Sequence, residues 1–191
     1  VRTAFAQEFL AHLHNLAFPV CFELIGLPDG IVVQLCCSDV DTPEVSQILE
    51  AFFPEIRTRH HRGFLASCWS ETARFGCFVD FGLSEHFLSP LADSPALEND
   101  PLIGVIGALN TLEEAELGLV QVCFEPARSP WAEDLLSVLS IADASGSATA
   151  VARRKMSQPL SAVLVRTASF SDSGKGAFAR VRSIGNALIA A

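Results

Sequence analysis

The sequence predicts an α+β fold, a ferredoxin-like sandwich in which helices pack on one face of a mainly antiparallel sheet. Half of the 191 residues are apolar, enough to form a substantial core. β-rich runs alternate with runs of helical periodicity, and in residues 20–37 two β-rich runs are joined by Pro28, Asp29 and Gly30, a strong hairpin signal. Strand pairs interleaved with helices favour this arrangement over a parallel sheet.

The expected elements before residue 100 are a helix at 3–18, the hairpin at 20–37, a helix at 41–56, a basic loop at 57–63, and strands at 64–70 and 74–83. Apolar residues of the first segment recur at helical spacing. In the second helix Thr42 is expected to be the N-cap, with Pro43 at the first helical position and the end before Pro54.

The expected elements after residue 100 are a helix at 100–112, a strand at 117–127, helices at 129–142 and 151–158, a strand at 159–170 and a helix at 174–190. Residues 143–150 are small and polar, which is typical of a linker and could also be an engineered join. The predicted organisation is therefore an α+β domain at 1–142, a flexible linker at 143–150, and a basic βα unit at 151–191 that packs on or extends the same domain.

Charge is spread unevenly along the chain. Residues 1–150 hold 21 Asp and Glu against 6 Lys and Arg, whereas residues 151–191 hold 7 Lys and Arg against Asp172 alone. A basic segment of this kind can contact a polyanion or dock on an acidic body, and the second interpretation is the simpler one. The candidate contact residues are Arg153, Arg154, Lys155, Lys175, Arg180 and Arg182.

The six cysteines lie among apolar neighbours and form no C-x-x-C pair. Buried, reduced thiols in a cytoplasmic protein are the expected state. No apolar run approaches the roughly 18–20 residues that span a bilayer, and no secretory signal is recognisable. We therefore expect a cytoplasmic chain without a membrane span.

Residues 169–183 have the outline of a phosphate-binding loop but lack its defining residues. The pattern G-x-x-x-x-G-K-[ST] would need glycine at Ser169 and a hydroxyl at Gly176. No nucleotide site is predicted here, although glycine-rich amides and Lys175 at a helix start could contact a phosphate weakly. A solvated lysine at an ordinary helix start is the favoured interpretation.

Other catalytic or metal-binding constellations are weak. His12 and His14 point to different sides of a helix, and Cys36 and Cys37 to opposite faces of a strand. The acidic cluster at 113–116 is expected to be a solvated turn. A cysteine nucleophile at 68 or 77 with His86 is the remaining enzymatic alternative, so we assign no catalytic, cofactor or metal residue.

The run 100–135 resembles the N-terminal region of HerA/FtsK-type ATPases that serve conjugative DNA transfer and type IV secretion. The resembling positions are Asp100, Pro101, Leu102, Glu114, Gln121, Pro126 and Trp131. In 153–170 a K-x-x-x-P-L…V-R strand is matched by Lys155, Pro159, Leu160, Val165 and Arg166. The resemblance covers roughly residues 20–190 and implies an accessory domain, since the nucleotide motifs of that family lie downstream in a separate motor.

The expected function is thus a non-catalytic assembly or interaction domain of a DNA-translocating or type IV secretion-type ATPase. Its partners would be copies of itself or other secretion proteins, with nucleic acid as a further candidate for the basic C-terminal segment. The alternative is a stand-alone ferredoxin-like domain that binds a small ligand or dimerises through its sheet.

Overall fold

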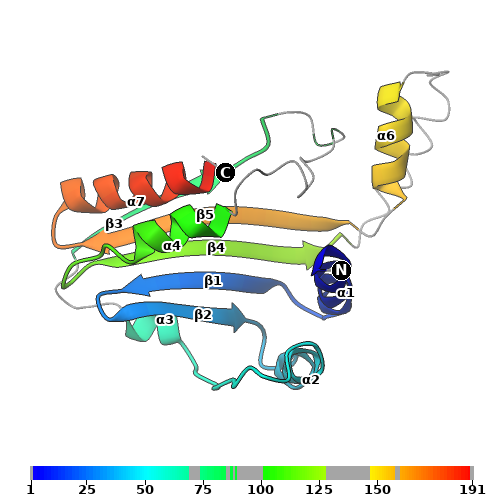
Figure 1. The fold of residues 1–191 in the computed structure, drawn as a ribbon, viewed down its shortest axis with the longest axis horizontal. Coiled ribbons are helices and arrows are strands. Elements are labelled where there is room, and N and C mark those ends of the chain that lie inside the picture. The colour runs from blue at the N-terminus through cyan, green and yellow to red at the C-terminus, as the bar shows by residue number, and fades with distance from the viewer. Residues whose placement is uncertain are drawn as a thin grey trace.

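A computed structural model describes residues 2–68, 74–84, 87, 89, 101–127, 147–157 and 160–189 (Figure 1). The fold is α+β, as expected, with a five-stranded sheet in which every pairing is antiparallel. The strands are β1 (Val20–Leu27), β2 (Gly30–Cys36), β3 (Phe75–Phe81), β4 (Leu117–Pro126) and β5 (Ser161–Ser171). Their order across the sheet is β2-β1-β4-β5-β3.

The hairpin between β1 and β2 is confirmed. Leu27 pairs with Gly30, and Gly30 has a φ of 149°, which L-amino acids with side chains rarely adopt. β5 lies between β4 and β3, so the last part of the chain completes the same sheet. β5 is followed by α7 (Gly174–Ile189).

Helices α4 (Pro101–Leu109) and α7 (Gly174–Ile189) cover one face of the sheet (Figure 1). The side chains buried in this layer are Leu24, Val105, Leu109, Val120 and Ile184. Gly26 and Gly118 are paired directly across β1 and β4, below the end of α4. A Cβ on Gly26 would lie 2.8 Å from the backbone oxygen of Leu109, so these glycines permit close packing of the helix on the sheet.

The opposite face is contacted by α3 (Phe64–Ser67), where the sequence predicted a strand at 64–70. That prediction was wrong for 64–67. Gly63 adopts a left-handed conformation, with φ at 66°, and starts a single helical turn that packs Phe64 and Leu65 against Ile25 and neighbouring core residues. A short apolar run cannot distinguish a strand from a buried helical turn by periodicity.

Helices α1 (Arg2–Leu13) and α2 (Thr42–Phe52) form a second core at one end of the sheet. Its buried residues are Leu13, Leu16, Val20, Val45 and Ile48. Both helices are shorter than predicted. Asp41 takes the N-cap position expected for Thr42, but its carboxylate accepts hydrogen bonds from the backbone amides of Ala17 and Phe18, both at 3.0 Å. The carboxylate thereby fixes the segment leaving α1 against the start of α2.

Helix α6 (Ser147–Met156) begins inside the stretch expected to be a linker. The predicted helix at 129–142 with Trp131, linker residues 143–146, and the positions of His86, Asp100 and Pro159 lie outside the described residues. Among the helices that the structure describes, none is long and apolar enough to cross a bilayer.

Candidate functional site

The basic residues expected to contact a partner do not form one surface. Lys155 on α6 donates hydrogen bonds to the backbone oxygens of Phe87 and Ser89. Lys175 is exposed on the first turn of α7. Helix α6 stands beyond one end of the sheet, whereas α7 begins at the opposite end (Figure 1). Arg153, Arg154 and Arg182 are exposed on these two helices.

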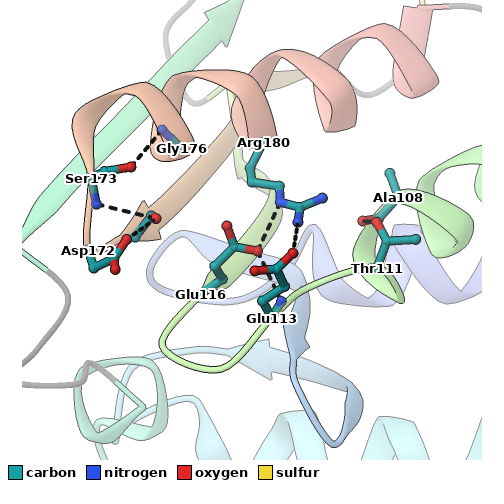
Figure 2. A network of polar contacts seen from close by, with 9 residues as sticks. Ala108, Thr111, Glu113, Glu116, Asp172, Ser173, Gly176 and Arg180 are labelled. Carbon is teal, nitrogen blue, oxygen red and sulfur yellow. Dashed lines mark hydrogen bonds and ion pairs between the residues drawn. The ribbon is translucent and has the colours of Figure 1, made fainter.

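The turn between β5 and α7 is an internally capped helix start (Figure 2). The backbone amide of Gly176 donates to the Ser173 hydroxyl at 3.1 Å, which is the bond made by a serine N-cap. A Cβ on Gly176 would lie 2.7 Å from Ser171 Oγ and 2.8 Å from Ser173 Oγ. A side chain at Gly176 would crowd these serine hydroxyls, so the glycine at this position has an explanation that needs no phosphate.

Arg180 lies in an ion-pair network with the acidic turn after α4 (Figure 2). Its Nε donates to Glu116 Oε2 at 2.9 Å, and its guanidinium lies 3.7 Å from Glu113 Oε1. The backbone amide of Glu113 donates to the same Glu116 oxygen at 3.0 Å. The side chain of Glu116 is only 11% exposed, so the expectation that these acids are solvated was wrong for Glu116. The guanidinium of Arg180 ties this turn to α7.

A row of polar side chains crosses the sheet on the face opposite α4 and α7. Each strand contributes one residue, and neighbouring residues of the row are direct partners in the strand pairing. In spatial order the row is Gln34, Glu23, Gln121, Arg166 and Asp80. This row was not predicted from the sequence. The sequence does show single polar residues inside otherwise apolar strands, such as Glu23 and Gln121, and these could have indicated it.

Glu23 is the buried centre of this row, 3% exposed. Its two carboxylate oxygens accept hydrogen bonds from Gln34 Nε2 and Gln121 Nε2, both at 2.5 Å. The Cys36 thiol donates to Glu23 Oε2 at 3.4 Å. A carboxylate removed from water needs such donors to offset its lost hydration. Here three side chains supply them, from the two strands that flank β1, which are β2 and β4.

The outer end of the row is a bidentate ion pair between Arg166 and Asp80. Arg166 donates to the two Asp80 oxygens at 2.6 and 3.0 Å, and its guanidinium lies 4.9 Å from the ring centre of Phe78. The hydrogen bonds from Arg166 hold the pKa of Asp80 below its usual value. The row thus runs from a buried carboxylate to an accessible charge pair.

The cysteines correct another expectation. Cys21 and Cys123 form a disulfide, although reduced thiols were predicted. The two residues are 102 positions apart in the sequence, and only the pairing of β1 with β4 places them opposite each other. Cys36 is the strand partner of Cys21 on the other side, so three cysteines form a row next to the polar row.

Burial, followed by the charge of Glu23, raises the pKa of the Cys36 thiol to about 12. Because the thiolate is the attacking species, protonated Cys36 exchanges slowly with the adjacent disulfide. The structure places Cys68 directly after α3 and Cys77 in β3, and both thiols are half-buried. These positions add no support to the alternative of a cysteine nucleophile.

Alkylation of Cys36 by iodoacetamide is expected to be at least tenfold slower at pH 8 than that of an ordinary thiol, and to accelerate without a plateau up to about pH 11. The raised pKa also stabilises the fold below about pH 9, and this contribution is lost as the pH rises toward 12. Mass spectrometry of the Cys36 peptide provides the rates. Glu23→Gln removes the second cause of the shift and should speed the reaction. Fast labelling at pH 8, with a rate that does not increase at higher pH, would contradict the raised pKa of Cys36.

Compared with family models, curated proteins and solved structures, the chain has no match. Within the described residues, no three His, Cys, Asp or Glu side chains are grouped to hold a metal ion.

Proposed function

We propose that this chain is a non-catalytic interaction domain that assembles a DNA-translocating or type IV secretion-type ATPase, with the nucleotide motifs in a motor outside this sequence. The carrying observation is the outer surface of α4. The resemblance of residues 100–135 and 153–170 supplies the class of parent protein. The proposal keeps the cytoplasmic location expected from the sequence, where the Cys21–Cys123 disulfide would be an uncommon feature.

Helix α4 contains no charged residue, and apolar side chains lie on both its sides. Val105 and Leu109 are fully buried against the sheet. Ile103, on the opposite side of the helix, is 70% exposed, and Leu102 and Ile106 are 44% and 43% exposed. A helix that is apolar all round is normally buried, and an exposed apolar patch commonly marks a protein interface. A protein partner therefore fits this surface better than a polyanion does.

The polar groups of the described residues support a structural role for the chain. Glu23 is bound by Gln34 and Gln121, and Arg180 is held by Glu116. The glycine-rich helix start is capped by Ser173. These groups act on one another within the fold. The basic residues of α6 and α7 lie at different ends of the sheet, so the proposal places a protein partner ahead of nucleic acid.

The proposal predicts that the chain neither binds nor hydrolyses Mg-ATP, which calorimetry and phosphate release can measure. It also predicts that Ile103→Glu dissociates the assembly of the parent protein, because a buried carboxylate would face an apolar partner. Light scattering of the parent measures the assembly. Val40→Glu is the matched control, since Val40 is 72% exposed in the turn before α2. ATPase activity of the chain alone, or an assembly unchanged by Ile103→Glu, would reject the proposal.

The alternative is a stand-alone domain that dimerises through its sheet, and one observation favours it, which is the composition of β3. A parent gene that encodes no motor would support this alternative over the first proposal.

A further inference from the structure

Strand β3 forms one edge of the sheet among the described strands, and its side chains are unusually apolar for that position. It pairs with β5 on one side. Phe75, Phe78 and Val79 are 48%, 63% and 41% exposed. An edge strand presents unpaired amides and carbonyls, and native proteins usually protect it with charges, bulges or short length. The apolar composition of β3 therefore indicates that another strand pairs with this edge.

The charges of this strand are symmetric about its centre. Arg74, directly before the strand, and Asp80 each lie three residues from Cys77. If the extended backbone continues through Arg74, this even spacing places both side chains on the same face. When two copies of β3 pair antiparallel with Cys77 opposite Cys77, Arg74 of each copy faces Asp80 of the other. A shift of one residue would instead set Arg74 opposite Val79 or Phe81. The charges thus specify one register.

The apolar residues fit the same register. Phe75 falls opposite Val79 of the second copy, an aromatic and β-branched pair of the kind that stabilises antiparallel strands. Phe78 falls opposite Gly76, which has no side chain to obstruct it. The ring of Phe170 lies over Gly76, because a Cβ there would be 2.5 Å from Phe170 Cε1. Phe78 of the second copy would therefore meet an aromatic ring above the glycine.

Asp80 can serve both copies. Its carboxylate already accepts two hydrogen bonds from Arg166 of its own chain, and an ionised carboxylate has about four acceptor positions. Arg74 of the second copy would occupy the remaining positions. Charges at an edge usually prevent pairing with other strands, but here opposite signs are aligned, so they permit one partner and repel misaligned ones.

We propose that the partner of β3 is a second copy of this chain, bound through an antiparallel β3–β3 pairing centred on Cys77. The two five-stranded sheets then become one continuous sheet with two-fold symmetry. This inference names a self-association partner for the interaction role proposed above, but it uses a different surface from α4. The two proposals can therefore fail separately.

The test measures the oligomeric state of the full chain by sedimentation equilibrium. We expect a dimer that Arg74→Glu weakens at least tenfold, because the introduced carboxylate would face Asp80 of the second copy. Arg59→Glu is the matched charge reversal in the exposed loop 57–63 and should leave the dimer unchanged. Arg74 is exposed before the strand begins, so its substitution should not alter the circular dichroism spectrum.

Oxidative cross-linking reports the register directly. Cys77 of one copy would face Cys77 of the other, as Cys21 faces Cys123 across β1 and β4. Diamide, which takes two electrons and two protons from the two thiols, should yield a covalent dimer on non-reducing gels. Cys77→Ser should abolish that cross-link while the dimer persists, and Cys68→Ser should not affect it.

A chain that stays monomeric at a concentration on the order of 100 μM, well above the Kd of a specific dimer, would overturn the inference. A dimer that resists Arg74→Glu but dissociates with Ile103→Glu would also overturn it, and would assign self-association to α4 instead. A dimer disrupted by Arg74→Glu but unaffected by Ile103→Glu supports it, whatever the parent protein shows.

Discussion

Replacing Glu23 with leucine is expected to lower the free energy of unfolding by about 3 kcal/mol. The carboxylate is 3% exposed and accepts hydrogen bonds from Gln34, Gln121 and Cys36. Leucine has a similar volume but no acceptor, so each donor would lose its partner on a half-buried sheet face. A buried donor left without an acceptor costs about 1–3 kcal/mol. The two glutamines account for most of the expected loss of stability, because a thiol is a weak donor. Relief from burying a charge offsets part of the loss.

Glu23→Gln is the matched control and should cost only about 1 kcal/mol. The glutamine keeps one acceptor oxygen, and the amide of Gln34 or Gln121 can rotate so that its oxygen accepts a hydrogen bond from the new NH₂ group. Urea denaturation at pH 7 measures both variants. The triple variant Gln34→Leu, Glu23→Leu and Gln121→Leu removes donors and acceptor together, and should recover most of the lost stability.

The triple variant separates a specific network from simple packing. If the donors around Glu23 carry the stability, the single leucine substitution is worse than the triple one. A triple variant that is less stable than Glu23→Leu would show that the glutamine side chains matter through other contacts. The network assignment would then be wrong.

Local chemistry in the sequence was enough to predict much of the fold. The hairpin at Pro28–Gly30, the helix that begins near Pro43, and the final strand and helix depend on turn residues, proline at helix starts and apolar periodicity. These signals act over a few residues, so a single sequence displays them directly. They also indicated that the basic residues of the C-terminal segment lie on helices, as they do in α6 and α7.

The features that depend on strand pairing could not be predicted in the same way. Glu23 and Gln121 are recognisable as polar residues in apolar strands, but their contact requires β1 beside β4 in one particular register. The Cys21–Cys123 disulfide depends on that same register. Arg180 illustrates the consequence for function. It was a candidate for contact with a polyanion, whereas the fold brings Glu116 to it across 64 residues of sequence.

Replacing Gly26 with alanine is expected to destabilise the fold by about 3 kcal/mol. The new Cβ would lie 2.8 Å from the backbone oxygen of Leu109 and 3.0 Å from its Cβ. These atoms belong to the frame of α4, so the helix itself must shift and the fully buried Leu109 must repack. Gly118→Ala should cost less, about 1–2 kcal/mol, because its close contacts at 2.9 Å are the flexible ends of Ile184 and Leu109.

Gly107→Ala is the control within α4 itself. Apart from the backbone of α4 itself, no atom of the described residues lies within 4 Å of a Cβ at Gly107. Alanine also has the higher helix propensity, so this variant should be stabilised by about 1 kcal/mol. Thermal and urea denaturation of the three variants should therefore rank Gly107→Ala above the parent chain, then Gly118→Ala, then Gly26→Ala. If Gly26→Ala were as stable as the parent chain, α4 would not rest directly on β1. Its exposed residues could not then be assigned to the outer side of the helical layer, and the interface proposed there would lose its basis.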